Sequence, residues 1–262
     1  MCKGEALMFD TLEVSADGAI GALWLNRPDK LNALSTRVLQ ELAQAAAWFD
    51  QQGEVRVVVV GGHGKAFSAG ADLAGFPALD AANLRAAADA GRIMADALEG
   101  MNALTIARIQ GWCVGGGLVI AAACDLRVAE SAARFSIPEV DLGIPLAWGG
   151  IPRLVREIGP ALTKELVITC REFDAEEARE AGFINRVVPG SDLDHAVKIL
   201  ARQIAAKPAI PVAATKRHTN AVTAQMTGTA RAWSDADSLI AALHDAECAA
   251  AREAYVASRL GK

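Results

Sequence analysis

The stretch that decides the fold reads Gly111-Trp112-Cys113-Val114-Gly115-Gly116-Gly117-Leu118-Val119-Ile120-Ala121-Ala122-Ala123-Cys124-Asp125. Three consecutive glycines open a run of small apolar residues, which predicts a turn leading into a helix whose first peptide N–H groups a ligand can approach. The positive end of the helix dipole favours negative charge there. A tight strand-to-helix turn explains glycines equally well when they are seen alone. A second motif is therefore needed to distinguish an anion site from a packing turn.

Composition narrows the class of protein. The chain has 262 residues, of which 52% are hydrophobic, so it can bury a large core in one or two domains. Its net charge of −5 argues against a nucleic-acid-binding surface. The sequence shows neither a leader peptide nor an apolar run of about 18 residues, so we expect a cytoplasmic protein with no membrane partner. The five cysteines form no CxxC pair and lack metal-ligand spacing, which indicates reduced thiols and no metal site.

Periodicity predicts an α/β fold. A hairpin is expected around Asp17-Gly18, and Ser35 is a candidate N-cap for the helix that follows. No strand pattern remains after Val188, so we place a boundary near Gly190 between an α/β part, residues 1–190, and a helical part, residues 191–262. The other expected strands cover 57–60, 105–110, 126–129, 134–136 and 185–188, and the other expected helices cover 83–101, 192–206, a segment from Val212, and 235–260.

A second glycine-rich stretch, Gly61 to Leu73, follows the strand at 57–60. It fails the phosphate-loop pattern, because position 59 is Val59 and position 66 is Ala66. His63 has no acid or nucleophile beside it and is interpreted as a turn residue. Two strand–glycine turn–helix units in tandem predict that both turns face one pocket at the strand ends.

Glu139 is the candidate acid/base. Pro138 prevents a helix from starting just before it, which places the carboxylate on a fixed loop or strand end. Asp141 is a possible second carboxylate, since it shares a side with Glu139 on an extended chain. Asp174 and Glu177 form a capping box and need no functional interpretation. Asp125 is expected to order the following strand.

Four motifs in order carry a resemblance that covers essentially the whole chain: Asn26 to Leu34, Phe67 to Leu73, Gly111 to Asp125, and Pro138-Glu139 with Leu142-Gly143 and Gly149-Gly150. Together they resemble the enoyl-CoA hydratase/isomerase (crotonase) superfamily. The resemblance implies a crotonase-like spiral of repeated ββα units and a C-terminal helical region that forms a homotrimer or a dimer of trimers. It also implies an acyl-CoA thioester substrate, with coenzyme A entering as part of the substrate and no separate cofactor.

The resemblance also implies site residues. The oxyanion-hole donors would be the peptide N–H groups of Ala71 and Gly116, which suit a thioester oxygen that becomes an enolate. Arg27 and Lys30 would meet the nucleotide end of coenzyme A, and Asp72 would act structurally or through its backbone. The full set of implied substrate contacts is Arg27, Lys30, Leu31, Ala33, Ser68, Ala69, Asp72, Leu73, Trp112, Gly115, Val119, Pro138, Leu142 and Trp148.

One position departs from the family pattern. Hydratases that this sequence resembles carry a glutamate two residues after the triple glycine, where this chain has Val119. Moving a proton between carbons needs one base, whereas adding water is easier with two carboxylates. The pattern favours isomerisation or single-glutamate hydration by Glu139. Thioester hydrolysis, decarboxylation, ring opening and non-catalytic acyl-CoA binding remain open, and Trp148 either narrows the acyl pocket or belongs to the core.

Overall fold

The computed structural model describes residues 7–72, 81–232 and 234–260. Its larger sheet has the strand order β1-β2-β3-β4-β5-β7-β10, antiparallel from β1 to β3 and parallel from β3 to β10. The seven strands are β1 (Leu7–Met8), β2 (Leu12–Asp17), β3 (Ile20–Leu25), β4 (Val57–Gly62), β5 (Leu104–Ile109), β7 (Leu126–Glu130) and β10 (Arg186–Val188). The mixed α/β architecture confirms the predicted fold class.

A smaller sheet joins β6 (Trp112–Val114), β8 (Arg134–Ser136) and β9 (Phe173–Asp174). The strand at 105–110 was expected to lead directly into the triple glycine, which is wrong: the chain turns at Gly111 and adds β6 first. Gly111 has φ +54°, and a Cβ there would lie 1.9 Å from the carbonyl oxygen of Lys65, so only glycine fits this corner. The units β5–β6–α3 and β7–β8–α4 each place one strand in each sheet, the repeat expected of the spiral.

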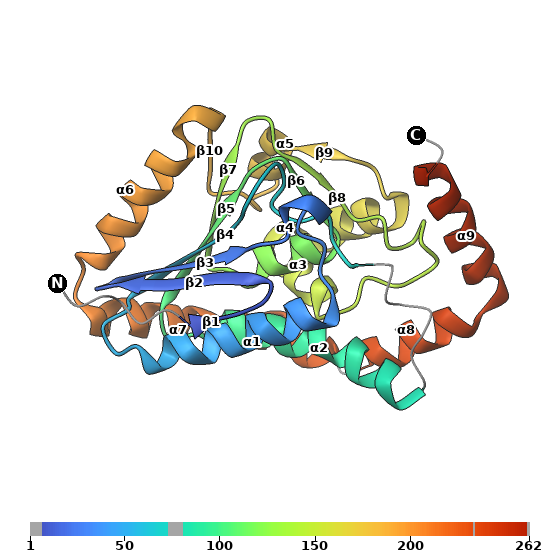
Figure 1. The fold of residues 1–262 in the computed structure, drawn as a ribbon, viewed down its shortest axis with the longest axis horizontal. Coiled ribbons are helices and arrows are strands. Elements are labelled where there is room, and N and C mark those ends of the chain that lie inside the picture. Colours follow the sequence, from blue (N-terminus) through green and yellow to red (C-terminus); the bar gives the residue numbers. More distant parts are fainter. Residues whose placement is uncertain (1–6, 73–80, 233, 261–262) are drawn as a thin grey trace.

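Helices cover the larger sheet on both sides (Figure 1). Val58 and Val60 of β4 belong to the cluster that holds α1, whereas Val57 packs with Ile106, Val128 and α6. β4 is thus buried on both faces, as its unbroken run of valines predicts. The helices are α1 (Thr36–Gln51), α2 (Ala81–Gly100), α3 (Gly116–Ala123), α4 (Gly150–Thr169), α5 (Ala175–Glu180), α6 (Leu193–Ala205), α7 (Ala209–Met226), α8 (Asp235–His244) and α9 (Ala246–Leu260).

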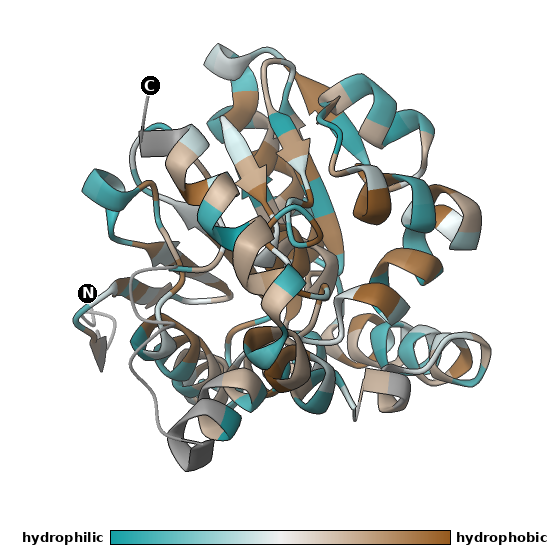
Figure 2. Ribbon diagram, turned by 90° about the vertical axis from the view of Figure 1, so that its right-hand side faces the viewer, coloured by the Kyte–Doolittle hydropathy of each residue, from teal (hydrophilic) through white to brown (hydrophobic). Residues whose placement is uncertain are grey.

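Two N-caps follow the sequence prediction. The Ser35 hydroxyl accepts from Val38 N at 3.4 Å, and Asp174 Oδ1 accepts from Glu177 N at 2.9 Å. Short 3-10 turns occur at Pro28–Lys30, Gly190–Asp192 and Thr229–Ala232. In Figure 2 the strands are mostly brown, while the outer helices mix brown and teal along their length.

In the C-terminal half, the structure differs from the predicted helices at three places. α4 was not predicted, and its regular pattern is interrupted at Gly159, whose φ is +76°. α7 begins at Ala209 rather than Val212, because Pro211 is tolerated within the first helical turn. The helix expected over 235–260 is two helices, since Asp245 is extended and its Oδ1 accepts from Cys248 N at 2.9 Å to begin α9. The boundary near Gly190 stays a prediction, and α6 packs against the sheet of the preceding part.

Candidate active site

The first wall of the site is the loop that carries Ala71. Leu34 N donates to Gly70 O at 2.8 Å, and Asp72 N donates to Leu34 O at 3.0 Å. These two bonds flank Ala71 in a parallel bridge to Leu34, so the N–H group of Ala71 itself points away from Leu34. Ala71 lines a small cavity. Its peptide donor is therefore available on the cavity side.

The second wall is the start of α3. Gly115 has φ +48° and precedes Gly116, the first residue of the helix. A Cβ on Gly70 would lie 3.7 Å from Gly116 N, so the two glycine-containing loops meet as the sequence predicted. Within the described part of the chain, the N–H groups of Ala71 and Gly116 have no acceptor. Two free donors, one of them at a helix N-terminus, can stabilise an anionic oxygen.

Glu139 forms the third wall. A compact turn holds it: Leu142 N donates to Pro138 O at 3.0 Å, and Ile144 N donates to Glu139 O at 2.9 Å. Its side chain is buried, and a Cβ on Gly115 would lie 2.3 Å from Glu139 Oε1. Oε2 has no hydrogen-bond partner within the described residues. Burial disfavours the charged form and raises the pKa of Glu139 to about 7.

The cavity between these walls is small and almost entirely apolar. Its volume is about 20 Å³, which is enough for one water-sized group. Among the described residues that line it, Glu139 is the sole titratable side chain; these residues are Ala71, Gly116, Val119, Glu139, Ile144, Pro145, Leu146, Ala147, Trp148 and Leu239. A carboxyl group that titrates near neutrality beside two free N–H donors is suited to moving a proton next to a carbonyl.

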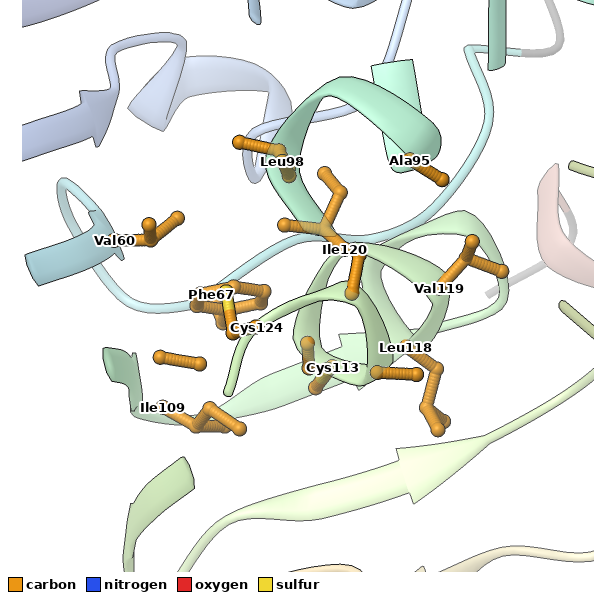
Figure 3. Packing of buried hydrophobic residues seen from close by; sticks show 14 of the residues in the cluster. Val60, Phe67, Ala95, Leu98, Ile109, Cys113, Leu118, Val119, Ile120 and Cys124 are labelled. Carbon is orange, nitrogen blue, oxygen red and sulfur yellow. The ribbon is translucent and has the colours of Figure 1, made fainter. Parts of the chain in front are cut away.

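Val119 stands on α3 at the cavity wall. It is 2% exposed and lines the cavity together with Glu139. Figure 3 shows it projecting from α3 beside Ile120, which lies close to Leu98 and Ala95 of α2. The position where the resemblance implies a second carboxylate is therefore an apolar part of the same cavity.

The predicted contacts at the nucleotide end lie on the neighbouring turn. Arg27 Nη2 lies 2.9 Å from Asp72 Oδ2, and Arg27 Nη1 donates to Ala33 O. Lys30 and Leu31 are exposed on this turn, and Ala69 N donates to Leu31 O at 2.8 Å. The structure thus brings these residues beside the Ala71 loop, with Arg27 and Asp72 engaged in fixing the two loops together.

Other predicted substrate contacts lie either in the protein interior or at its surface. Ser68 is fully buried, and its hydroxyl donates to Asn32 O at 2.9 Å, so its side chain faces the protein interior. Trp112 is 38% exposed and does not line the cavity, and Leu142 packs in a cluster with Leu239. Pro138 is buried beside Glu139. Leu73 lies outside the described residues.

The two remaining aspartates do not reach the cavity. Asp141 is exposed and is absent from the cavity wall. Asp125 Oδ2 accepts from Thr105 N at 2.7 Å and pairs with Lys216 Nζ at 2.7 Å, so it ties α3 to β5 and α7. The sequence interpretation expected Asp125 to order the following strand, whereas its side chain bonds to the preceding strand β5 and to α7.

Sequence reasoning missed three residues that shape the site. Leu239 of α8 closes one side of the cavity, and nothing local in the sequence signals this. Gly91 lies inside α2 against the Trp148 indole, and a glycine within a helix pattern is the one available signal. Arg153 is fully buried, and its guanidinium contacts the carbonyl oxygens of Trp148 and Gly149.

A larger cleft, of about 750 Å³, lies between α7 and the end of α3. Its three carboxylates are paired: Asp125 with Lys216, Glu157 with Arg127 at 2.6 Å, and Glu99 with Arg156. The cleft therefore offers no free carboxylate base among the described residues, and its remaining cation, Lys207, is exposed. The smaller cavity is the candidate active site. Within the described residues, no three His, Cys, Asp or Glu side chains are placed to hold a metal ion, and none of the helices combines the length and apolarity needed to cross a bilayer.

Comparison with known proteins found similar sequences and similar folds. The family model described as enoyl-CoA hydratase/isomerase matches residues 15–260. A probable enoyl-CoA hydratase of Mycobacterium bovis is 37% identical over 190 residues, covering 71% of this chain and 72% of the relative. A crotonyl-CoA hydratase of Syntrophomonas wolfei is 34% identical over 215 residues, covering 82% and 83%. A crystal structure of an enoyl-CoA hydratase subunit from Geobacillus kaustophilus superposes with a TM-score of 0.77 at 36% identity, covering 82% and 83%.

Proposed function

Because the chain belongs to the enoyl-CoA hydratase/isomerase family, we propose that it processes an enoyl-CoA thioester through an enolate, with Glu139 as its acid/base. The observation that carries this proposal is the buried Glu139 carboxyl, whose Oε2 has no partner among the described residues and whose pKa is raised to about 7. In the described part of the chain, it is the titratable side chain of a cavity that also holds two peptide donors without an acceptor.

The two donors would act on the thioester oxygen. The N–H groups of Ala71 and Gly116 would bind this oxygen more strongly as it gains negative charge, which stabilises the enolate over the ground state. Loss of one such donor typically costs about 10²–10³ in rate. Both donors belong to the backbone, so side-chain substitution acts on them only by moving the loops.

Isomerisation would use Glu139 alone. The ionised carboxylate takes a proton from the carbon next to the double bond, and the electron pair moves to the thioester oxygen. The resulting enolate collapses as the Glu139 carboxyl returns the proton to the other end of the three-carbon system. The substrate and product have the same atoms, and Glu139 ends as it began.

Hydration would need one water in addition. Glu139 takes a proton from that water, the hydroxide adds to the β carbon, and the enolate receives the proton at the α carbon. Val119 offers that water no second carboxylate, so we expect isomerisation to be the faster reaction.

A product assay separates these reactions. The protein is incubated with enoyl-CoA esters that carry the double bond at either of two positions, and products are identified by mass and ultraviolet absorbance. Isomerisation leaves the mass unchanged, hydration adds one water, and thioester hydrolysis releases free coenzyme A. Decarboxylation and ring opening are scored on substrates of those classes by the same mass readout.

Glu139→Gln tests the assigned residue. This variant should lower kcat by about 10²–10⁴ and still bind the CoA ester. Asp141→Asn is the matched control, because Asp141 lies two residues away and is exposed outside the cavity. Full activity of Glu139→Gln on every substrate would refute the assignment, and loss of activity in Asp141→Asn would move the acid/base role to Asp141.

Non-catalytic acyl-CoA binding is the second candidate, favoured by the apolar Val119 in the cavity wall. Under that candidate, acyl-CoA esters bind without turnover at any chain length. Val119→Glu would then create hydration activity in a protein that had none. Val119→Gln is the control for the change in shape, because glutamine is similar to glutamate in size and is uncharged.

The proposal includes assembly into a homotrimer or a dimer of trimers. Ile210, Val222 and Met226 of α7 are 80%, 48% and 78% exposed, which is unusual for apolar side chains along one helix of a single chain. Light scattering coupled to size exclusion measures the mass directly. A monomeric mass at micromolar concentration would contradict this part of the proposal.

A further inference from the structure

The indole of Trp148 occupies a slot made by two glycines on two helices. A Cβ on Gly91 of α2 would lie 2.2 Å from Trp148 Cδ2 and Cγ, and a Cβ on Gly116 of α3 would lie 2.2 Å from Trp148 Cζ3. Any side chain at either position would collide with the ring. Glycine inside a helix is less stable than alanine, so Gly91 is accounted for by the space that the indole takes.

The backbone around Trp148 is held from two further sides. Trp148 has φ +61° and Gly149 has φ +68°, both in the left-handed region. Arg153 Nη1 donates to Trp148 O at 3.4 Å and to Gly149 O at 3.2 Å, and Gly149 N donates to Asp235 Oδ2 at 2.8 Å. The indole is therefore fixed by its slot, by α4 and by α8.

Arg153 is itself anchored. Its Nη2 lies 2.9 Å from Asp96 Oδ1 and 2.6 Å from Glu99 Oε2, both on α2. The helix that carries Gly91 thus also carries the carboxylates that hold the arginine. One helix supplies the surface under the ring and the anchor for its backbone, so the ring has little freedom to swing out of the cavity.

The fixed ring lies where an acyl chain would extend. It lines the cavity together with Glu139 and Leu239, and its six-membered edge meets Gly116, one of the proposed donors. A chain whose thioester oxygen were bound by the Gly116 and Ala71 N–H groups would lie beside this wall, because both residues line the same cavity as Trp148. The space beside the ring is about 20 Å³, so any acyl group has to displace side chains of the wall, and a longer chain has to displace more of them.

We propose that Trp148, seated between Gly91 and Gly116, is the specificity-determining residue that restricts the substrate to short acyl groups such as crotonyl. This inference rests on the proposed acyl-CoA function. It agrees with the similarity to the crotonyl-CoA hydratase of Syntrophomonas wolfei. In this structure the limit comes from a rigid wall rather than from a polar contact, so removal of the wall should lengthen the accepted chain.

Trp148→Ala tests the limit by turnover and by binding. The ratio of kcat/KM for decenoyl-CoA to that for crotonyl-CoA should rise about tenfold or more in the variant. The ratio of Kd values for the unreactive esters decanoyl-CoA and butyryl-CoA should shift in the same direction. Trp48→Ala, which removes a half-buried tryptophan of α1, should leave both ratios unchanged.

The slot itself is tested by a double-mutant cycle on thermal stability. Gly91→Ala should lower Tm while Trp148 is present, and should be tolerated in the Gly91→Ala/Trp148→Ala double variant because the colliding ring is gone. Gly100→Ala on the same helix is the matched control, since a Cβ there meets nothing within 4 Å. Additive effects in the cycle would show that the ring does not occupy the slot.

The outcomes separate the inference from the proposed function. If wild-type protein binds decanoyl-CoA and butyryl-CoA equally, or if Trp148→Ala leaves the ratio unchanged, the inference is wrong while acyl-CoA binding stands. If neither ester binds and no enoyl-CoA is turned over, the proposed function fails, and the inference fails with it. If esters bind selectively without turnover, the inference holds on a non-catalytic protein.

Discussion

The carboxyl group of Glu139 rests against the α-carbon of Gly115, so closely that a Cβ on this glycine would lie 2.3 Å from Glu139 Oε1. Gly115 also has φ +48°. Gly115 therefore has two effects. It turns the chain so that the Gly116 N–H faces the cavity, and it leaves space for the proposed base.

Gly115→Ala should lower kcat by about 10² or more. The added methyl group would push the Glu139 carboxyl out of its position, and even a small misplacement of a catalytic group slows the reaction strongly. It also strains a backbone in the left-handed region. Steady-state kinetics with crotonyl-CoA measures the loss, and circular dichroism confirms the fold. Gly53→Ala, where a Cβ meets nothing within 4 Å, should behave as wild type. Unchanged kcat in Gly115→Ala would show that Glu139 does not act from this position.

The pH dependence of the rate should report Glu139. Burial raises its pKa to about 7, so the ionised base is scarce below that pH and dominant above it. We expect kcat/KM to rise with pH through a midpoint near 7 and then level off. A pH series with crotonyl-CoA checks this. A flat profile between pH 5 and 8, the window that spans this pKa, would contradict the role of Glu139 as a base.

Stability should depend on the same group with the opposite trend. A carboxyl whose folded pKa is raised holds its proton more tightly in the folded state, so the stability it contributes is complete below its unfolded pKa and is lost as pH rises through about 7. At pH 8 Glu139→Gln should therefore be more stable than wild type, by at most about 3 kcal/mol. Urea unfolding at pH 5 and pH 8 measures the difference. If Glu139→Gln gained the same stability at pH 5 and at pH 8, ionisation of Glu139 would not be the cause of the gain.

Arg153→Ala should destabilise the protein by about 2–5 kcal/mol, because it empties the space of a fully buried side chain and removes one of the two arginine partners of Asp96 and of Glu99, which keep Arg92 and Arg156. It also frees the carbonyl groups of Trp148 and Gly149. Arg171→Ala is the surface control: this arginine pairs with Glu165 and Glu177 at 36% exposure and should cost less than about 1 kcal/mol. Equal losses of stability in Arg153→Ala and Arg171→Ala would show that the buried Arg153 network stabilises the protein no more than a surface ion pair does.

Local patterns predicted most of the fold. The Asp17-Gly18 hairpin, the Ser35 and Asp174 caps and the valine run of β4 all depend on near neighbours in the chain, and the structure has them. β1 and β9 were missed because strands of two residues carry no periodicity, and β6 was missed because its three residues lie inside the glycine-rich stretch that was interpreted as a turn. α4 was missed because Pro152, Gly159 and Pro160 interrupt its pattern.

The candidate site could also be predicted only in part. The glycine turns and the Pro138-Glu139 pair could be found from the sequence, together with their shared pocket. The residues that decide the shape of this pocket could not, since Leu239 and Gly91 reach Trp148 and Glu139 from distant helices. Contacts between separate helices leave no periodic signal, which is why the size of this cavity could be found only from the structure.

Leu239 and Asp235, both on α8, complete the pocket and hold the Trp148 loop. During synthesis on the ribosome these residues emerge after Glu139 and both glycine turns. A chain without α8 lacks the wall that Leu239 supplies, so the burial that raises the pKa of Glu139 is incomplete in it. The raised pKa of the proposed acid/base therefore depends on a segment that is made after it, and a partly made chain would carry Glu139 without that property.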